Sequence, residues 1–394
     1  GRLFALLPLG SIARRFNLFS AVSAAGAAAL VSLCALQVLQ AAADGLGPGD
    51  GRPGPGMSQV SKGQRNTHHA LVRAILALGV ALAAAVAPTL WSQATISEVY
   101  ALNAFFFAAL LYIALRGPTS SVAWAGCGAL LGLGLGNHLT LLMVAPALGI
   151  LLRPAANPRR ILAGLAGLLL GLSVYLYLPL AARSDPPINW GNPSTWQGFW
   201  WLVSGRIYHG YAFSLPLHHL PSRLGAWLSL VVEQYTLLGL ALALNGLWSW
   251  VENGSRRWAW ATGITFLLVT VYAVSYDTAD SYVYLIPAHL LVALWIGEGA
   301  RAMLSMLAAT RLRPLALPVV IGLLLFITGW SLARNLPRLD LSRDQEAGRW
   351  AEQIEQTLPP DALLITGVDA HTFTLHYMRW VERRGPDLIV VDGE

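Results

Sequence analysis

Long apolar stretches alternate with short polar connections along this chain. A helix needs about 20 predominantly apolar residues to cross a bilayer, and ten stretches have this character, two of them short. They are residues 18–41, 70–91, 98–115, 121–136, 138–152, 161–181, 225–250, 258–275, 283–305 and 314–334. The pattern predicts an all-α polytopic membrane protein, a helical bundle of about ten spans.

The short stretches 121–136 and 138–152 meet at Gly136-Asn137-His138. They form either a tight helical hairpin or one long kinked helix, so the span count stays open by two. With the hairpin, most basic residues fall in alternate connections, which the positive-inside rule assigns to the cytoplasm. These residues are Arg52, Lys62, Arg65, Arg73, Arg116, Arg153, Arg159, Arg160, Arg256, Arg257, Arg301, Arg311 and Arg313. The outward segments are then 92–97, 136–138, 182–224, 276–282 and the chain after 335.

The chain divides into three expected parts. Residues 1–16 suit an interfacial helix with arginines at its flanks, for which a signal peptide is the rival interpretation. Residues 17–335 form the membrane domain, with a Gly- and Pro-rich cytoplasmic loop at 43–68 and an aromatic outward loop at 182–224. Residues 336–394 read as a truncated, small extracytoplasmic α/β domain.

The tail pattern is specific enough to assign elements. Asp344–Gln356 and 372–383 have helical patterns, whereas 362–366 and 388–391 read as strands. Helix, strand, helix, strand at this spacing predicts parallel strand pairing.

The composition is typical of a membrane protein, and it argues against a nucleic-acid partner, a disulfide framework and a metal site. The chain is 55% apolar and 12% charged, with a mean hydropathy of +0.54. The net charge of +6 does not indicate a nucleic-acid partner, because the bases lie in short loops beside spans. Cys34 and Cys127 each lie inside an apolar stretch, so neither a disulfide framework nor a metal site is expected.

A carboxylate in the polar turn from Trp91 to Tyr100 is the first candidate for chemistry. A charged residue at the centre of a membrane helix costs about 2.5 to 3.5 kcal/mol on insertion scales, and less near the interface. Glu98 is therefore expected to face water or protein in a functional site.

The outward loop 182–224 supplies further candidates. Guanidinium groups match phosphate with bidentate hydrogen bonds, so Arg183 and Arg206 could hold a lipid-linked phosphate. Lipid-headgroup or carboxylate pairing is the alternative for both, and membrane-interface anchoring is the alternative for the loop tryptophans. The other polar candidates in this loop are Asp185, Asn189, Trp190 and Tyr208.

Smaller clusters complete the set. Asn137 and His138 occupy a Gly-flanked turn, and a structural histidine is the competing interpretation of His138. Asp277, Asp280 and Tyr282 join two spans, where helix capping is the alternative for the aspartates. Asp369 and His371 follow the first strand of the tail, where α/β folds often place ligand groups.

Several of these motifs resemble a known family when taken in order. They are Trp91-Ser-Gln, Glu98-Val-Tyr-Ala-Leu-Asn103, Gly134-Leu-Gly-Asn-His138, Tyr175-Leu-Tyr-Leu-Pro179 and Pro186-Pro-Ile-Asn-Trp-Gly191. Together they are similar to a bacterial membrane family of unknown function (domain of unknown function 2723) related to protein O-mannosyltransferases.

The resemblance implies a GT-C-type glycosyltransferase in the bacterial inner membrane. Such an enzyme transfers a sugar, here mannose-like, from a polyprenyl-phosphate carrier to a hydroxyl of a protein or glycan acceptor on the outer face. The lipid-linked sugar is a co-substrate, and no further cofactor is implied. The family's usual catalytic acid lies in the first outward loop, which is expected before Gly1, so the chain is taken as a fragment lacking its first span.

The resemblance also implies roles for individual residues. Glu98 is the expected catalytic carboxylate within this chain, where it either assists the base or orients the acceptor hydroxyl. The expected substrate-binding residues are Tyr100, Asn137, His138, Arg183, Asp185, Asn189, Trp190, Arg206, Tyr208, Asp277, Asp280 and Tyr282. A transporter or flippase of lipid-linked sugar is the alternative, since the same groups could bind without chemistry.

Overall fold

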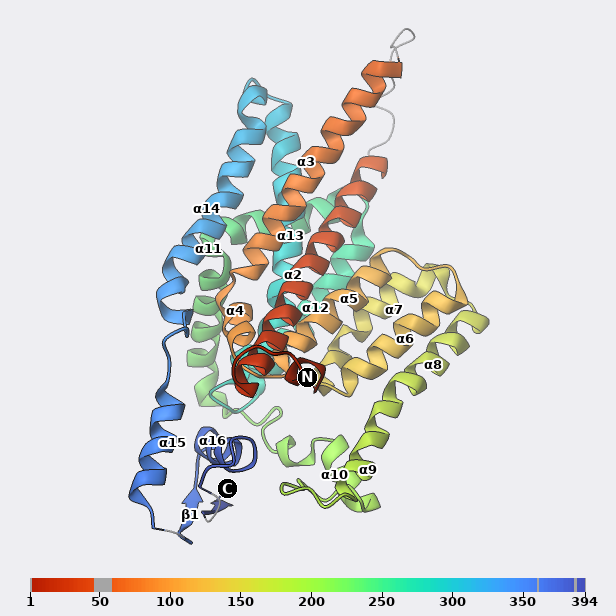
Figure 1. Ribbon diagram of the computed structural model, residues 1–394. Coiled ribbons are helices and arrows are strands. Elements are labelled where there is room, and N and C mark those ends of the chain that lie inside the picture. Colours follow the sequence, from red (N-terminus) through yellow and green to blue (C-terminus); the bar gives the residue numbers. More distant parts are fainter. Residues whose placement is uncertain (1, 46–58, 360, 386–387, 394) are drawn as a thin grey trace.

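The computed structural model describes residues 2–45, 59–359, 361–385 and 388–393, and most of them are helical (Figure 1). Among these residues, seven helices are long and apolar enough to cross a membrane. They are α2 (Ile12–Gly45), α3 (Gln59–Ala85), α8 (Pro158–Leu172) with its continuation through η3 (Ser173–Leu176) into α9 (Tyr177–Ala182), α11 (Leu220–Glu252), α12 (Arg256–Ser275), α13 (Ile286–Ala308) and α14 (Arg313–Leu339). The chain is thus a multi-pass membrane protein.

Three shorter apolar helices accompany them: α5 (Tyr100–Leu115), α6 (Ser121–Leu135) and α7 (Ala145–Leu152), the last preceded by the 3₁₀ turn η1 (Leu139–Val144). Each of the ten predicted apolar stretches falls on one of these helical segments. The remaining short helices are α1 (Arg2–Ala5), α4 (Pro88–Thr95), α10 (Trp196–Val203), η2 (Arg153–Ala155), η4 (Arg206–Tyr208), η5 (Leu217–His219) and η6 (Ser281–Leu285).

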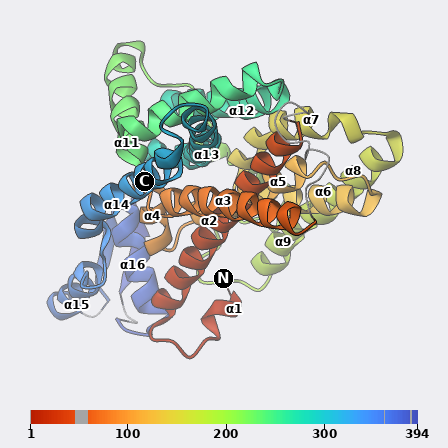
Figure 2. The same cartoon turned by 90° about the horizontal axis from the view of Figure 1, so that it is seen from above.

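Helix α13 forms the centre of the bundle, as the view from above shows (Figure 2). All its residues from Ile286 to Ala300 are buried, and α2, α3, α5, α11, α12 and α14 pack around it. A helix that is apolar on all sides belongs in the interior. The 3₁₀ helix η6, which leads directly into α13, is therefore held in a fixed position at that end of the bundle.

The turn at Gly136-Asn137-His138 separates two distinct helices. His138 has an extended backbone, with φ −156° and ψ 129°, so the helix cannot continue through it. Beyond the turn, α7 packs on α5 and α12, whereas α6 packs on α8. The long kinked helix is excluded, and the turn itself reaches the same end of the bundle as η6.

The tail folds as the pattern predicts. Helix α15 (Glu346–Thr357), strand β1 (Leu363–Thr366), helix α16 (Asp369–Trp380) and strand β2 (Ile389–Asp392) follow in order, and β1 pairs with β2 in parallel, Leu363 opposite Ile389. Ala351, Leu375, Met378 and Leu388 form its small core. We call residues 346–392 the C-terminal unit; it lies below the bundle in Figure 1.

The N-terminal segments differ from expectation at their edges. The interfacial helix expected over 1–16 is divided: α1 covers only Arg2–Ala5, and Ile12 already begins α2, because Pro8 and Gly10, which has φ 61°, interrupt the helix. Residues 46–58 of the expected loop 43–68 lie outside the described residues, but α3 begins at Gln59. Gln, Lys and Arg are good helix formers, so the helix continues beyond its apolar part.

Candidate functional site

Glu98 lies in the turn between α4 and α5. Pro88 at the first position starts α4, and the extended backbone of Ile96 ends it. The turn is held by the Glu98 N–H, which donates to the Ile96 carbonyl at 3.1 Å, and by Asn137, whose Nδ2 donates to the Val99 carbonyl at 3.0 Å. Two segments predicted to share one side of the membrane are therefore in direct contact.

Two further carboxylates act on Glu98 from distant parts of the chain. Partial burial raises the pKa of the Glu98 carboxyl above its ordinary value, the Val99 N–H opposes this by hydrogen bonding to it, and the negative charges of Asp280 and Asp369 raise it further. Glu98 nevertheless remains accessible to solvent. It is a carboxylate that binds a proton more readily than usual and can exchange it with a substrate.

A cluster of aromatic rings lies beside this carboxylate. Tyr100 lies 5.4 Å from His138 and 5.8 Å from Tyr284, measured between ring centroids, and Tyr276 lies 5.1 Å from Tyr284. The Tyr284 hydroxyl is hydrogen-bonded to those of Tyr100 and Tyr276. The rings bring α5, the turn at His138, the end of α12 and η6 together. We call Tyr100, His138, Tyr276 and Tyr284 the tyrosine cluster.

His138 is neutral in this environment. Burial lowers its pKa to about 4. Its Nδ1 accepts a hydrogen bond from the Thr140 N–H at 3.3 Å, which places the proton of the neutral ring on Nε2. The same side chain caps η1, so His138 has a structural task as well as a position in the cluster.

The outward loop reaches the cluster through two tyrosines. The Tyr211 ring lies 6.0 Å from that of Tyr276, and the Asp277 N–H donates to the Tyr211 carbonyl at 2.9 Å. Burial raises the pKa of the Tyr208 hydroxyl, and the charges of Asp369, Tyr211 and Glu98 add to this effect. Tyr208 thus lies within the electrostatic reach of two of the three carboxylates.

The C-terminal unit lies next to the outward loop and Glu98. Asp369 begins α16, and Phe373, one turn later, stacks on Trp190 of the outward loop with ring centroids 6.0 Å apart. The Tyr377 hydroxyl accepts a hydrogen bond from the Ala13 N–H at 3.2 Å. His371, the other candidate after β1, stacks on Trp350 inside the unit at 4.4 Å and so supports the unit's own packing.

Some of the predicted site residues make no described contact with the tyrosine cluster. Arg183 caps the end of α9, Arg206 begins η4, and both side chains are exposed; in the described structure neither donates a side-chain hydrogen bond or forms an ion pair. Asp185 is exposed in a left-handed conformation, φ 49°, Asn189 donates to Asn192 Oδ1 at 3.3 Å, and Tyr282 lines a separate pocket.

Sequence reasoning did not assign Arg223 or Tyr211 to a site. Both lie in the loop 182–224, where Arg223 is one of several basic residues and Tyr211 is one of several aromatic residues. Among the described residues, no three side chains of the His, Cys, Asp and Glu types group closely enough to hold a metal ion.

The comparison with protein families covers the first part of this arrangement, from α1 to the first residue of α8. Residues 1–158 match the protein O-mannosyl-transferase TMEM260 N-terminal domain family. The matched region contains Glu98, Tyr100, Asn137 and His138, whereas Asp280 and Asp369 lie beyond it. The match supports a membrane glycosyltransferase and specifies neither its donor nor its acceptor. No curated protein and no solved structure matches the chain.

Proposed function

We propose that this chain acts as a membrane glycosyltransferase that moves a sugar from a polyprenyl-phosphate carrier to a hydroxyl group of a protein or glycan acceptor. The observation that carries the proposal is the convergence of Glu98, Asp280 and Asp369 beside the tyrosine cluster, in a chain whose first 158 residues match an O-mannosyl-transferase family. The sugar is mannose-like by this kinship.

The chemistry requires one proton acceptor. The acceptor hydroxyl oxygen attacks the anomeric carbon, the bond between that carbon and the carrier phosphate oxygen breaks, and the phosphate leaves with the bonding electrons. Glu98 takes the hydroxyl proton as general base, and its raised pKa makes it a better acceptor. Asp280 and Asp369 then act on the reaction by holding the pKa of Glu98 high.

The leaving phosphate needs positive charge or hydrogen-bond donors near it. Arg183 and Arg206 supply guanidinium groups on the outward loop, and their exposed side chains are free to turn toward a substrate. Four side chains could form hydrogen bonds with sugar hydroxyls: Tyr100, Asn137, His138 and Tyr208. The further substrate-binding residues in this proposal are Asp185, Asn189, Trp190, Asp277, Asp280 and Tyr282.

The proposed orientation places the Glu98 end of the bundle outside a bacterial inner membrane. The connections α11–α12 and α13–α14 leave the bundle at the opposite end from the C-terminal unit (Figure 1). Arg311 lies in the second connection, and the helices that follow begin with Arg256 and Arg257 in α12 and with Arg313 in α14. The positive-inside rule supports a cytoplasmic position for that end.

The test is transfer of radiolabelled sugar from polyprenyl-phosphate mannose, and from its glucose counterpart, to acceptors in membranes that contain the protein. Glu98→Gln removes the base with almost no change of shape, and a loss of transfer of about 10²-fold or more is expected. The matched control is Glu252→Gln, an exposed carboxylate at the other end of the bundle. It should transfer at the unaltered rate.

The alternative is a transporter of the same lipid. If Glu98→Gln and the unaltered protein both carry the lipid-linked sugar across vesicle membranes, and neither transfers label, the transferase proposal is wrong. Loss of transfer in Glu252→Gln as well would show that the assay responds to protein damage rather than to the site.

A further inference from the structure

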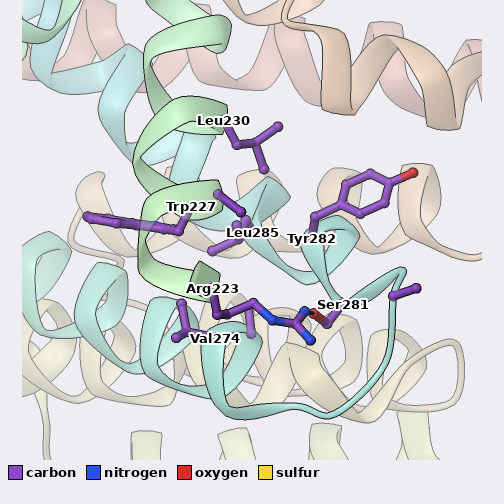
Figure 3. Close-up of a pocket in the computed structure, with 10 residues that line it drawn as sticks. Arg223, Trp227, Leu230, Val274, Ser281, Tyr282 and Leu285 are labelled. Atoms are coloured by element: carbon purple, nitrogen blue, oxygen red, sulfur yellow. Dashed lines mark hydrogen bonds between the residues drawn. The ribbon is translucent and has the colours of Figure 1, made fainter. Parts of the chain in front are cut away.

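A pocket of about 220 Å³ opens between the first turns of α11 and the end of α12, next to η6 (Figure 3). Its walls are mostly apolar: Trp227 and Leu230 come from α11, Val274 from α12 and Leu285 from η6. Arg223 lies at one side of it, with Ser281 beside its guanidinium in the close-up. The pocket is smaller than the roughly 300 to 1,000 Å³ typical of a site for a whole drug-sized ligand, so it suits one end of an elongated molecule.

Arg223 is fixed in place, and among the described residues it has no anionic partner. Its Nη1 donates to the Thr278 carbonyl at 2.9 Å and to Ser281 Oγ at 2.7 Å. In the described part of the chain no carboxylate forms an ion pair with it. The other guanidinium nitrogens therefore keep their donors. A half-buried arginine in this state is complementary to an anion.

The location decides what kind of anion fits. Candidate membrane spans begin at Leu217 and at Ser281, so Arg223 lies near one end of two spans, where a bilayer places its headgroups, and the apolar walls continue from it along α11 toward Leu230. A ligand with a phosphate at one end and a hydrocarbon chain at the other satisfies both parts. We propose that this pocket binds the phosphate and first isoprenoid units of the lipid carrier, with Arg223 as the phosphate ligand.

The segment Ala279–Tyr284, which connects the pocket with the candidate site, favours the carrier over a bilayer phospholipid as the ligand. Ala279, Ser281 and Tyr282 line the pocket, whereas Asp280 acts on Glu98 and Tyr284 belongs to the tyrosine cluster. One short segment thus serves the pocket and the candidate site together. The assignment rests on the proposed transferase function.

The experiment measures binding of a radiolabelled short-chain polyprenyl phosphate to the purified protein in detergent, without any transfer step. Arg223→Gln removes the phosphate ligand, and Ala226→Trp fills the pocket without changing charge; each should raise the Kd at least tenfold. The controls are Arg257→Gln at the opposite end of the bundle and Leu228→Trp on the exposed face of α11, both with unaltered Kd. Thermal unfolding checks that each variant is folded.

Competition identifies the occupant. Unlabelled polyprenyl phosphate should displace the label, whereas excess phosphatidylglycerol or inorganic phosphate should not. Equal competition by phosphatidylglycerol overturns the assignment to the carrier, and unaltered binding in Ala226→Trp overturns the pocket as the site even if Arg223→Gln does not fold. Carrier binding that depends on Arg223 in a protein that transfers no sugar would leave this site standing and reject the transferase.

Discussion

The fold shifts the pKa values of Glu98 and His138 in opposite directions. Burial and the charges of Asp280 and Asp369 raise the pKa of Glu98, whereas burial lowers that of His138 to about 4. At neutral pH the histidine carries no charge, so it does not neutralise the carboxylates. The cluster keeps a negative potential, and a positive group near the leaving phosphate must come from elsewhere, as Arg183, Arg206 and Arg223 do in our proposals.

The influence of Asp369 on Glu98 can be measured as a shift of the pH-rate profile. A general base works only when ionised, so transfer should rise with pH through the pKa of Glu98, which lies above the ordinary 4.5. Asp369→Asn removes a like charge and lowers that pKa. The acid limb of the profile should therefore move to lower pH, and transfer at neutral pH should fall slightly, because the ionised Glu98 is then a weaker base.

The comparison for this shift is Glu352→Gln, which removes an exposed carboxylate from the same C-terminal unit and should leave the profile in place. An acid limb that stays put in Asp369→Asn would mean that the C-terminal unit does not act on the base in solution.

For single residues, the sequence indicates function where placing the residue in its surroundings costs free energy. Glu98 could be singled out because a carboxylate between two apolar stretches needs a reason. Arg223 could not, because basic residues are common beside spans. What distinguishes it is that no carboxylate in the described part of the chain pairs with it, and only the folded structure shows this. The carboxylates that act on Glu98 come from residues 280 and 369, and no local pattern connects them.

Among the elements, α6 and α8 show how glycine sets helix packing. A Cβ added at Gly128 would lie 1.9 Å from the Gly164 carbonyl oxygen, and one at Gly171 would lie 2.2 Å from that of Ala129. The two backbones are thus in contact with no side chain between them. Small residues permit this close approach in membranes, where lipid offers no hydrophobic force to drive association.

A methyl group should be enough to disturb this interface. Gly128→Ala forces the two helices apart, and an overpacked interface typically costs about 1 to 3 kcal/mol. Gly126→Ala, on the same helix, meets open space and should be neutral or slightly stabilising, since alanine favours helix by up to about 1 kcal/mol over glycine. Thermal unfolding of both variants in detergent tests the difference; equal midpoints would show that the helices do not pack this closely.

Helix positions followed from apolar runs, but breaks inside those runs did not. The stretch 70–91 was expected as one span, yet the helix ends at Ala85 and restarts at Pro88, where Ser331 Oγ donates to the freed Val86 carbonyl at 2.8 Å. Within 225–250, Thr236 leaves the helical conformation with φ 63°. Pro88 marks its break in the sequence, whereas Thr236 carries no such mark because its conformation depends on packing.

The whole molecule assembles its candidate site from segments that are far apart in the chain. Successive connections alternate between the two ends of a helical bundle, so counting spans predicts which segments share an end. The segments at the end with Glu98 are 137–138, 208–211, 276–284 and the tail. Their actual meeting depends on α13 at the centre, on the outward loop that turns back to Ser275 through the Leu215 N–H at 3.3 Å, and on the C-terminal unit that stacks Phe373 on Trp190.

The orientation of this end can be tested with cysteine labelling, because both native cysteines are buried, Cys34 at 0% and Cys127 at 5% exposure. Ser204 ends α10 beside the site, and Thr310 lies in the α13–α14 connection at the basic end; both are exposed. If the positive-inside rule holds, a membrane-impermeant maleimide should label Ser204→Cys in intact spheroplasts and Thr310→Cys only after permeabilisation. The reverse pattern would place Glu98 in the cytoplasm, where an acceptor on the outer face could not reach it, and labelling of the protein without either substitution would show that the native cysteines are not protected as the packing requires.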